Sequence, residues 1–170
     1  MVVGKKVMIL GAVGVGKTSL SHRLAFNKFD GSYKATIGVV VYNANVEIDG
    51  GAAGDTMPLV LWDTDGDFGM HIFENTYLRG ASAAVIVADA TRPVTIPHLK
   101  RLVLGFKDRL PGRPCAAILN KADLLAGALP SMSPDDYGSP DFTTLTSALS
   151  GDGVQPTFSR LAAIMLRRGL

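Results

Sequence analysis

The glycine-rich stretch "GAVGVGKT" at residues 11–18 constrains the fold of this chain more than any other feature. It follows the apolar run "KKVMIL" at 5–10, which is typical of a short strand, and it precedes residues 19–29, where Leu20, Leu24 and Phe26 could share one helical face. The pattern G-x-x-x-x-G-K-[ST] between a strand and a helix is typical of a loop that wraps phosphate groups. Its glycines let backbone N–H groups curl around phosphate oxygens, and the helix N-terminus adds partial positive charge.

This loop gives specific expectations for side chains. Lys17 would reach the outer phosphates of a nucleotide, and the hydroxyl of Thr18 suits Mg²⁺, which prefers oxygen ligands. The expected phosphate-binding residues here are Gly14, Val15, Gly16, Lys17, Thr18 and Ser19.

Strand-like and helix-like segments alternate along the rest of the chain. Strands are expected at 37–49, 59–62, 83–89, 114–119 and 142–148, with helices at 96–110 and 155–168. The first two of these strands would form an antiparallel hairpin around the glycine-rich turn at 50–58, and 126–140 would hold at most a short helix. The alternation predicts an α/β, doubly wound fold built on a mostly parallel sheet with one antiparallel hairpin strand.

Composition limits the functions that such a chain can have. At 170 residues, with 47% apolar residues, residues 1–170 are expected to form a single domain. A net charge of +2 gives no reason to expect nucleic acid, and Cys115 alone excludes an internal disulfide. The N-terminus does not resemble a signal peptide, no run reaches the ~20 apolar residues of a membrane helix, and no lipid-anchor motif is visible. We therefore expect a cytoplasmic protein.

Three aspartates occur within five residues in "LWDTDGDFGM" at 61–70. In a doubly wound sheet, the strand that ends at "LVLW" delivers Asp63 to the crevice that holds the phosphate loop. A buried carboxylate at a strand end needs a positive partner, so Asp63 is expected to face the metal ion, through water.

A second motif distinguishes the base. "NKAD" at 120–123 follows another strand, and a carboxylate such as Asp123 accepts two parallel hydrogen bonds from the N–H and NH₂ of guanine but not from adenine. Asn120 would tie neighbouring loops together, and the stem of Lys121 would lie over the base. "TSA" at 146–148 would bring Ser147 and Ala148 beside the base, where a backbone N–H meets its carbonyl.

Together these motifs resemble the Ras-like small GTPases, and the Rab branch most. "FDGSYKATIG" at 29–38 resembles the family's first switch, and "TYLRGA" at 76–81 is similar to a run typical of Rab proteins. The resemblance implies that Phe29 packs against guanine, Tyr33 closes over the phosphates, Thr36 binds Mg²⁺ and the terminal phosphate, and Gly66 contacts that phosphate. It also implies GTP and GDP as bound nucleotides, Mg²⁺ as cofactor, and effector or regulator proteins that bind through residues 29–41 and 62–80.

The catalytic positions depart from the family pattern. The residues expected to support GTP hydrolysis are Lys17, Thr36, Gly66 and Asp67. Asp67 stands where the family carries a water-orienting glutamine, and an ionised aspartate is shorter, accepts without donating, and repels phosphate. Val13 adds a branched side chain where many members carry a small residue.

These departures leave two functions open. One is a switch that hydrolyses GTP slowly. The alternative is a GTP- and GDP-binding interaction module with no useful hydrolysis. Asp65 and Asp67 could also point to solvent and affect neither. The aromatic residues Trp62 and Tyr77 match the Rab partner surface, although Val41 replaces a usual phenylalanine, and they could equally pack between switch and sheet.

Overall fold

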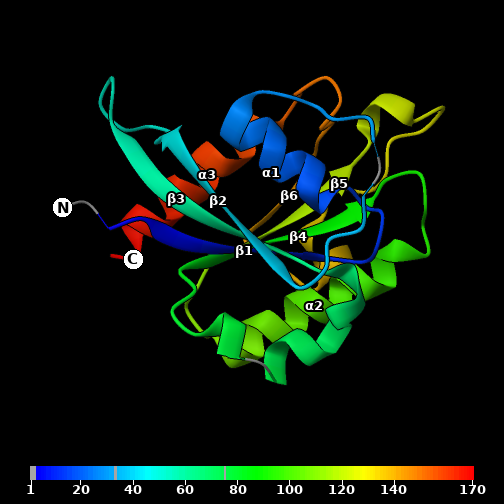
Figure 1. Ribbon diagram of the computed structural model, residues 1–170, viewed down its shortest axis with the longest axis horizontal. Coiled ribbons are helices and arrows are strands. Elements are labelled where there is room, and N and C mark those ends of the chain that lie inside the picture. Colours follow the sequence, from blue (N-terminus) through cyan, green and yellow to red (C-terminus); the bar gives the residue numbers. More distant parts are fainter. Residues whose placement is uncertain (1–2, 33, 75) are drawn as a thin grey trace.

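The computed structural model describes residues 3–32, 34–74 and 76–170, drawn in Figure 1. Within them the chain forms a six-stranded sheet in the order β2-β3-β1-β4-β5-β6. β2 pairs antiparallel with β3, and the other neighbours pair in parallel. The α/β, mostly parallel fold with one antiparallel hairpin strand is therefore confirmed.

The elements fall close to the segments that the sequence patterns predict. The strands are β1 Lys5–Gly11, β2 Val39–Glu47, β3 Thr56–Thr64, β4 Ala83–Asp89, β5 Cys115–Asn120 and β6 Phe142–Leu145. The α-helices are α1 Lys17–Phe26, α2 Thr95–Arg109 and α3 Val154–Arg167. Short 3₁₀ turns are η1 Gly66–Glu74, η2 Thr76–Leu78, η3 Ala122–Leu124 and η4 Pro134–Tyr137.

The sheet buries both of its faces, which explains the continuous apolar runs of its central strands. Along β1, Val7 and Ile9 pack into the core that α1 and α3 cover, whereas Met8 and Leu10 pack into the core beneath α2. Figure 1 shows α1 and α3 on one side of the sheet and α2 on the other. This packing fixes the carboxyl ends of β1, β3, β4 and β5, from which the functional loops emerge.

One helical prediction is wrong. Phe26 does not share the buried face of Leu20, because its side chain is 56% exposed while that of Leu20 is fully buried. The helix ends at Phe26, and Asn27 follows in the left-handed region with φ 51°. Phe26 instead packs edge-on against His22, with ring centroids 5.6 Å apart.

Two weaker segments behave as predicted. Residues 126–140 hold the single short turn η4, and Cys115 is a buried residue of β5, where burial raises the pKa of its thiol to about 12. The last strand is shorter than expected, since β6 ends at Leu145 and leaves "TSA" in the following loop. In the described parts of the chain, no helix has the length and apolar character needed to cross a membrane.

Candidate nucleotide-binding cleft

A cleft of about 840 Å³ opens at the carboxyl ends of the central strands. It gathers most of the residues that sequence patterns select, although they come from five separate segments. Those that line it are Gly14, Gly16, Lys17, Thr18, Ser19, Phe29, Thr36, Gly66, Asp67, Asn120, Lys121, Asp123 and Ala148. Three others stand just behind its wall: Val15, Asp63 and Ser147, which are buried. Tyr33 lies outside the described residues.

The phosphate loop owes its shape to glycine. Gly16 has φ 103°, and a Cβ there would lie 2.2 Å from the side-chain nitrogen of Asn120. No larger residue can therefore bring the loop this close to the base-side loop. The buried ammonium group of Lys17 donates to the carbonyls of Gly11 and Ala12, each at 2.9 Å. Burial lowers the pKa of Lys17 to about 8, against the opposing pull of the nearby aspartates.

Three oxygen-bearing side chains converge next to the loop in a way that fits Mg²⁺. The hydroxyls of Thr18 and Thr36 are 2.8 Å apart, and Thr18 donates to Oδ2 of Asp63 at 2.5 Å. The other carboxylate oxygen of Asp63 is buried and meets no donor among the described residues. Burial raises the pKa of Asp63, and a cation here would satisfy both the orphaned oxygen and the charge.

Few protein oxygens converge at this site, which is the usual situation for Mg²⁺ bound with a nucleotide. The described residues contain no cluster of three or more His, Cys, Asp or Glu side chains that could enclose a metal. Mg²⁺ instead combines one or two protein oxygens with water and substrate phosphates. Thr18, Thr36 and Asp63 therefore suit a metal that arrives with a nucleotide.

Asn120 joins the two halves of the cleft. Its side-chain nitrogen donates to the carbonyl of Val15 at 3.0 Å. Its side-chain oxygen accepts from the Thr146 hydroxyl at 3.0 Å and from the N–H of Ala148 at 3.2 Å. Asn120 is only 1% exposed, so these bonds satisfy a buried amide and lock the phosphate loop to the loop after β6.

The carboxylate that would recognise a base lies at the exposed rim. Asp123 stands in η3, and one of its oxygens accepts a hydrogen bond from the buried Ser147 hydroxyl at 2.6 Å. That bond fixes the side chain and leaves the second oxygen available for a ligand. Ser147 thus has a positioning contact that its motif did not predict.

The remaining wall of the cleft comes from residues within 29–41 and 62–80, the two segments that resemble switches. The N–H of Asp65 donates to the carbonyl of Gly38 at 2.8 Å, which joins the segments. The carboxylate of Asp65 accepts from the N–H of Asp67 at 2.9 Å and so caps the start of η1. Asp67 itself is exposed and lines the cleft. Gly66 presses against the phosphate loop, since a Cβ there would lie 2.5 Å from the nitrogen of Val13.

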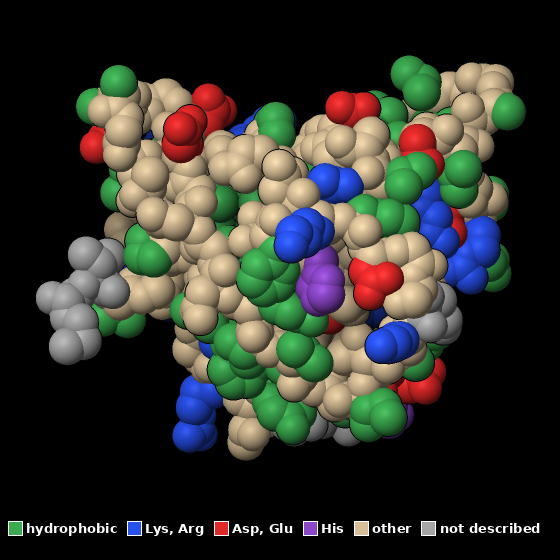
Figure 2. Space-filling view, turned by 45° about the horizontal axis from the view of Figure 1, so that its top comes forward, with side chains coloured by type: hydrophobic (Ala, Val, Ile, Leu, Met, Phe, Trp, Pro, Cys, Tyr) green, Lys and Arg blue, Asp and Glu red, His purple; other side chains and the backbone are tan. Residues whose placement is uncertain are grey.

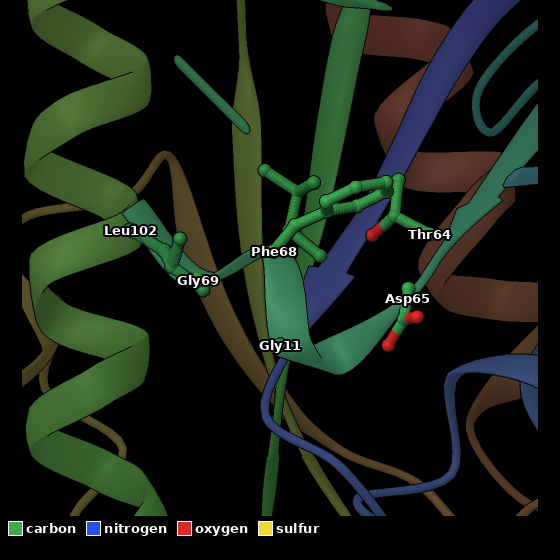
Figure 3. A pocket seen from close by; sticks show the side chains of 7 residues that line it. Gly11, Thr64, Asp65, Phe68, Gly69 and Leu102 are labelled. Carbon is green, nitrogen blue, oxygen red and sulfur yellow. The ribbon is translucent and has the colours of Figure 1, made fainter. Parts of the chain in front are cut away.

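Behind η1 lies a narrow pocket that is lined by residues of η1, β1 and α2. Figure 3 shows Gly69 beside Leu102 of α2, while Asp65 points away from that helix. Gly69 interrupts the 3₁₀ geometry with φ 47° and ψ −133°. The chain therefore turns back toward α2 directly after Phe68, and the turn keeps Asp65 and Gly66 at the cleft.

Trp62 and Tyr77 pack together, which supports the packing interpretation of these aromatic residues. Their ring centroids are 6.2 Å apart, and the Lys6 ammonium lies 3.6 Å from the centroid of a Trp62 ring. Lys6 also donates to the backbone carbonyls of Tyr77 and Arg79. Neighbouring Val41 is 47% exposed, so part of this surface remains open beside the aromatic group.

The sequence patterns did not predict two of the contacts around the cleft. His22 lines the cleft, and its Nε2 lies 3.1 Å from the hydroxyl of Tyr42, a pairing between α1 and β2 with no local sequence signal. Arg92 reaches the phosphate loop from the turn after β4. The motif "DATR" at 89–92 begins at the end of β4, which neighbours β1 in the sheet. Its position could have indicated that Arg92 lies near the phosphate loop.

The face shown in Figure 2 carries Lys and Arg side chains that are interspersed with acidic and apolar ones. No expanse of a single sign covers this face.

Comparison with known proteins gives consistent matches. The family model for the Ras of Complex, Roc, domain of DAPkinase matches residues 6–123. The Ras-related protein Rab-36 of Mus musculus is 33% identical over 178 residues, which cover 97% of this chain and 63% of that protein. The Ras-related protein RABA1e of Arabidopsis thaliana is 30% identical over 166 residues, covering 95% of this chain and 75% of the relative. The chain thus spans about 63% of the length of the mouse and human Rab-36 proteins.

Proposed function

This chain belongs to the Ras-like small GTPases, in their Rab branch, and from that premise we propose that it is a guanine-nucleotide switch that binds GTP or GDP with Mg²⁺. The observation that carries the proposal is the position of Asn120, which bonds to the phosphate loop and to the loop after β6 at once. One buried side chain thereby sets the spacing between the phosphate end and the base end of a single cleft.

Guanine is the base that the rim favours. The Asp123 carboxylate suits the paired N–H and NH₂ donors of guanine, because one oxygen is unused and the oxygen bonded to Ser147 keeps a second lone pair. The Lys121 stem borders the same region, and Phe29 lines the cleft nearby. The Ala148 N–H already donates to Asn120 at 3.2 Å, so a base carbonyl would share this donor or replace that long bond.

We further infer that the chain hydrolyses GTP by in-line attack of water. Lys17 would bind the outer phosphates, and the N–H groups of Thr36 and Gly66 would hold the terminal one. Mg²⁺, held with Thr18, Thr36 and Asp63, would neutralise charge on the phosphates. Catalysis of this kind depends on positioning and electrostatics, so the residue that orients water decides the rate.

Slow hydrolysis follows from the side chain at that position. Asp67 lines the cleft but accepts hydrogen bonds without donating when ionised, and its charge would face the phosphates. Val13 is 42% exposed toward the same space and narrows it. The same two features favour the alternative function, a GTP- and GDP-binding interaction module with no useful hydrolysis.

Effector or regulator proteins would bind to residues 29–41 and 62–80 and so distinguish the GTP-bound from the GDP-bound form. Exposed apolar side chains support this proposal, among them Ile37, which precedes the edge strand β2, and Val40 and Val41 within it. We propose that this nucleotide cycle takes place in the cytoplasm.

The base assignment has a direct test in Asp123→Asn. The substitution replaces an acceptor pair with one acceptor and one donor, which suits xanthine better than guanine. We expect the affinity for GDP to fall by about 100-fold, since hydrogen bonds to a charged group contribute ~1.5–3 kcal/mol each, and xanthosine diphosphate to bind better than before. Calorimetric titration of wild type and variant with both nucleotides measures this change in base preference. Undiminished GDP binding by the variant would overturn the assignment.

A further inference from the structure

Arg92 is held on a rigid turn at the end of β4. The N–H and hydroxyl of Thr95 both donate to its carbonyl, at 2.9 and 2.8 Å, and its own N–H donates to the carbonyl of Asp89 at 3.0 Å. Pro93 follows directly. The backbone thus fixes the direction in which this long side chain leaves the sheet.

The guanidinium group of Arg92 crosses to the phosphate loop. Its Nη2 donates to the carbonyl of Val13 at 3.0 Å. A Cβ built on Gly14 would lie 3.5 Å from the same nitrogen, so the group stands directly against the turn that lines the cleft. These contacts and the bond to Asp89 use two of the five N–H groups of arginine. The side chain is 45% exposed, which leaves the other donors accessible.

The buried carboxylate of Asp89 binds two cations, Lys121 on the base side of the cleft and Arg92 on the phosphate side. Oδ2 of Asp89 lies 2.8 Å from the ammonium of Lys121 and 3.0 Å from Nε of Arg92, while its side chain is 1% exposed. Burial opposes ionisation of Asp89, but hydrogen bonds from Lys121, Thr91 and Arg92 outweigh it and lower its pKa to about 2. Asp89 is therefore ionised near neutral pH and anchors Arg92 next to the loop.

We propose that Arg92 is a positioning residue for the phosphate end of the nucleotide, which fixes the Val13–Gly14 turn and keeps a positive charge beside it, and so slows nucleotide release. The inference rests on the proposed nucleotide-binding function. The phosphate loop cradles the α- and β-phosphates through its backbone N–H groups. A cation that holds this turn therefore acts on the β-phosphate more than on the base.

A plain ion pair with Asp89 does not account for the geometry. Such a pair would satisfy Asp89 without the bond to Val13, whereas Arg92 spans the gap between β4 and the loop that follows β1. A planar guanidinium can bond in two directions at once, and a lysine ammonium at this site would lose that bridging geometry.

The test compares release of GDP with binding of GMP, which lacks the β-phosphate. Stopped-flow release of a fluorescent GDP and calorimetric binding of GDP and GMP are measured for the wild type, Arg92→Ala, Arg92→Gln and Arg92→Lys. Arg167→Ala is the matched control, because it removes one exposed arginine from the last turn of α3, at the opposite end of the sheet from the cleft.

We expect GDP release to accelerate about tenfold in Arg92→Ala and Arg92→Gln, with an intermediate rate for Arg92→Lys and an unchanged rate for the control. The GMP affinity should change less than about twofold. Equal losses for GDP and GMP, or an unchanged GDP release rate in both charge-removing variants, would overturn the role of Arg92 and leave the proposed function intact. A wild type that binds neither nucleotide would instead overturn the proposed function itself.

Discussion

At the base end of the cleft Asn120 is 1% exposed and makes three hydrogen bonds, whereas at the switch end Asp67 is exposed and its N–H rests on a single turn bond to Asp65. The two ends use similar polar side chains, but Asn120 is bonded to two loops, whereas Asp67 belongs to a 3₁₀ segment that kinks at Gly69. The cleft thus has a fixed end, around Asn120, and an adjustable end, around Asp67.

This difference has a physical basis. A group that recognises a ligand gains from being preorganised, because binding then costs less ordering. A segment that responds to a terminal phosphate must be able to rearrange when that phosphate leaves. A Cβ built on Gly66 would lie 2.5 Å from the nitrogen of Val13, which shows how closely the adjustable end approaches the phosphate loop.

The largest predicted effect lies at the fixed end. Asn120→Ala removes the partners of the Val15 carbonyl, the Thr146 hydroxyl and the Ala148 N–H. Each buried group left unpaired costs ~1–3 kcal/mol, so we expect the free energy of unfolding to fall by at least about 3 kcal/mol. Urea unfolding measures the loss. Asn45→Ala, on an exposed position of the edge strand β2, should stay within ~0.5 kcal/mol of wild type, and a similar loss in both variants would contradict this account.

A second, smaller effect should appear as a pH dependence. The folded pKa of Asp89 is lowered to about 2, below the usual value of 3.8, so its contribution to stability is complete above about pH 4 and disappears as the pH falls toward 2. After allowance for solvent near the half-exposed Arg92, this contribution is about 1–2 kcal/mol. In urea unfolding, the stability advantage of wild type over Asp89→Asn should shrink from pH 5 to pH 3. A constant difference across that range would show that the charge of Asp89 is not responsible.

The sequence predicted the fixed end better than the adjustable one. "GAVGVGKT" and "NKAD" each follow a strand of the parallel sheet, β1 and β5, with β4 between them. Parallel strands keep their carboxyl ends at one edge of the sheet, so the meeting of Lys17, Thr18 and Asn120 follows from these two motifs and the fold. The contacts of Arg92 with Val13 and of His22 with Tyr42 join residues 79 and 20 positions apart, and nothing local encodes them. Phe26 was misplaced because residues 20 and 26 stand about 120° apart around an α-helix, so helical spacing does not put them on one face.

The smallest predicted effect tests the adjustable end. Asp67→Gln replaces a charged acceptor with a carboxamide that both donates and accepts, so it should orient water better and remove repulsion from the phosphates. Because Asp67 is exposed, water screens its charge, and we expect a gain near the lower limit of the Coulomb range, about 1 kcal/mol, or about fivefold in single-turnover GTP hydrolysis.

Two companion variants separate charge from geometry. Asp67→Asn removes the charge but keeps the short side chain, and Asp65→Asn keeps an acceptor for the Asp67 N–H while it removes the neighbouring charge. If water orientation limits the rate, Asp67→Gln should exceed Asp67→Asn, and Asp65→Asn should stay close to wild type. If all three variants are equally fast, negative charge at this end is the obstacle. If wild type already matches Asp67→Gln, the switch end is as well arranged for hydrolysis as the base end is for binding, and slow hydrolysis is no longer part of the proposed function.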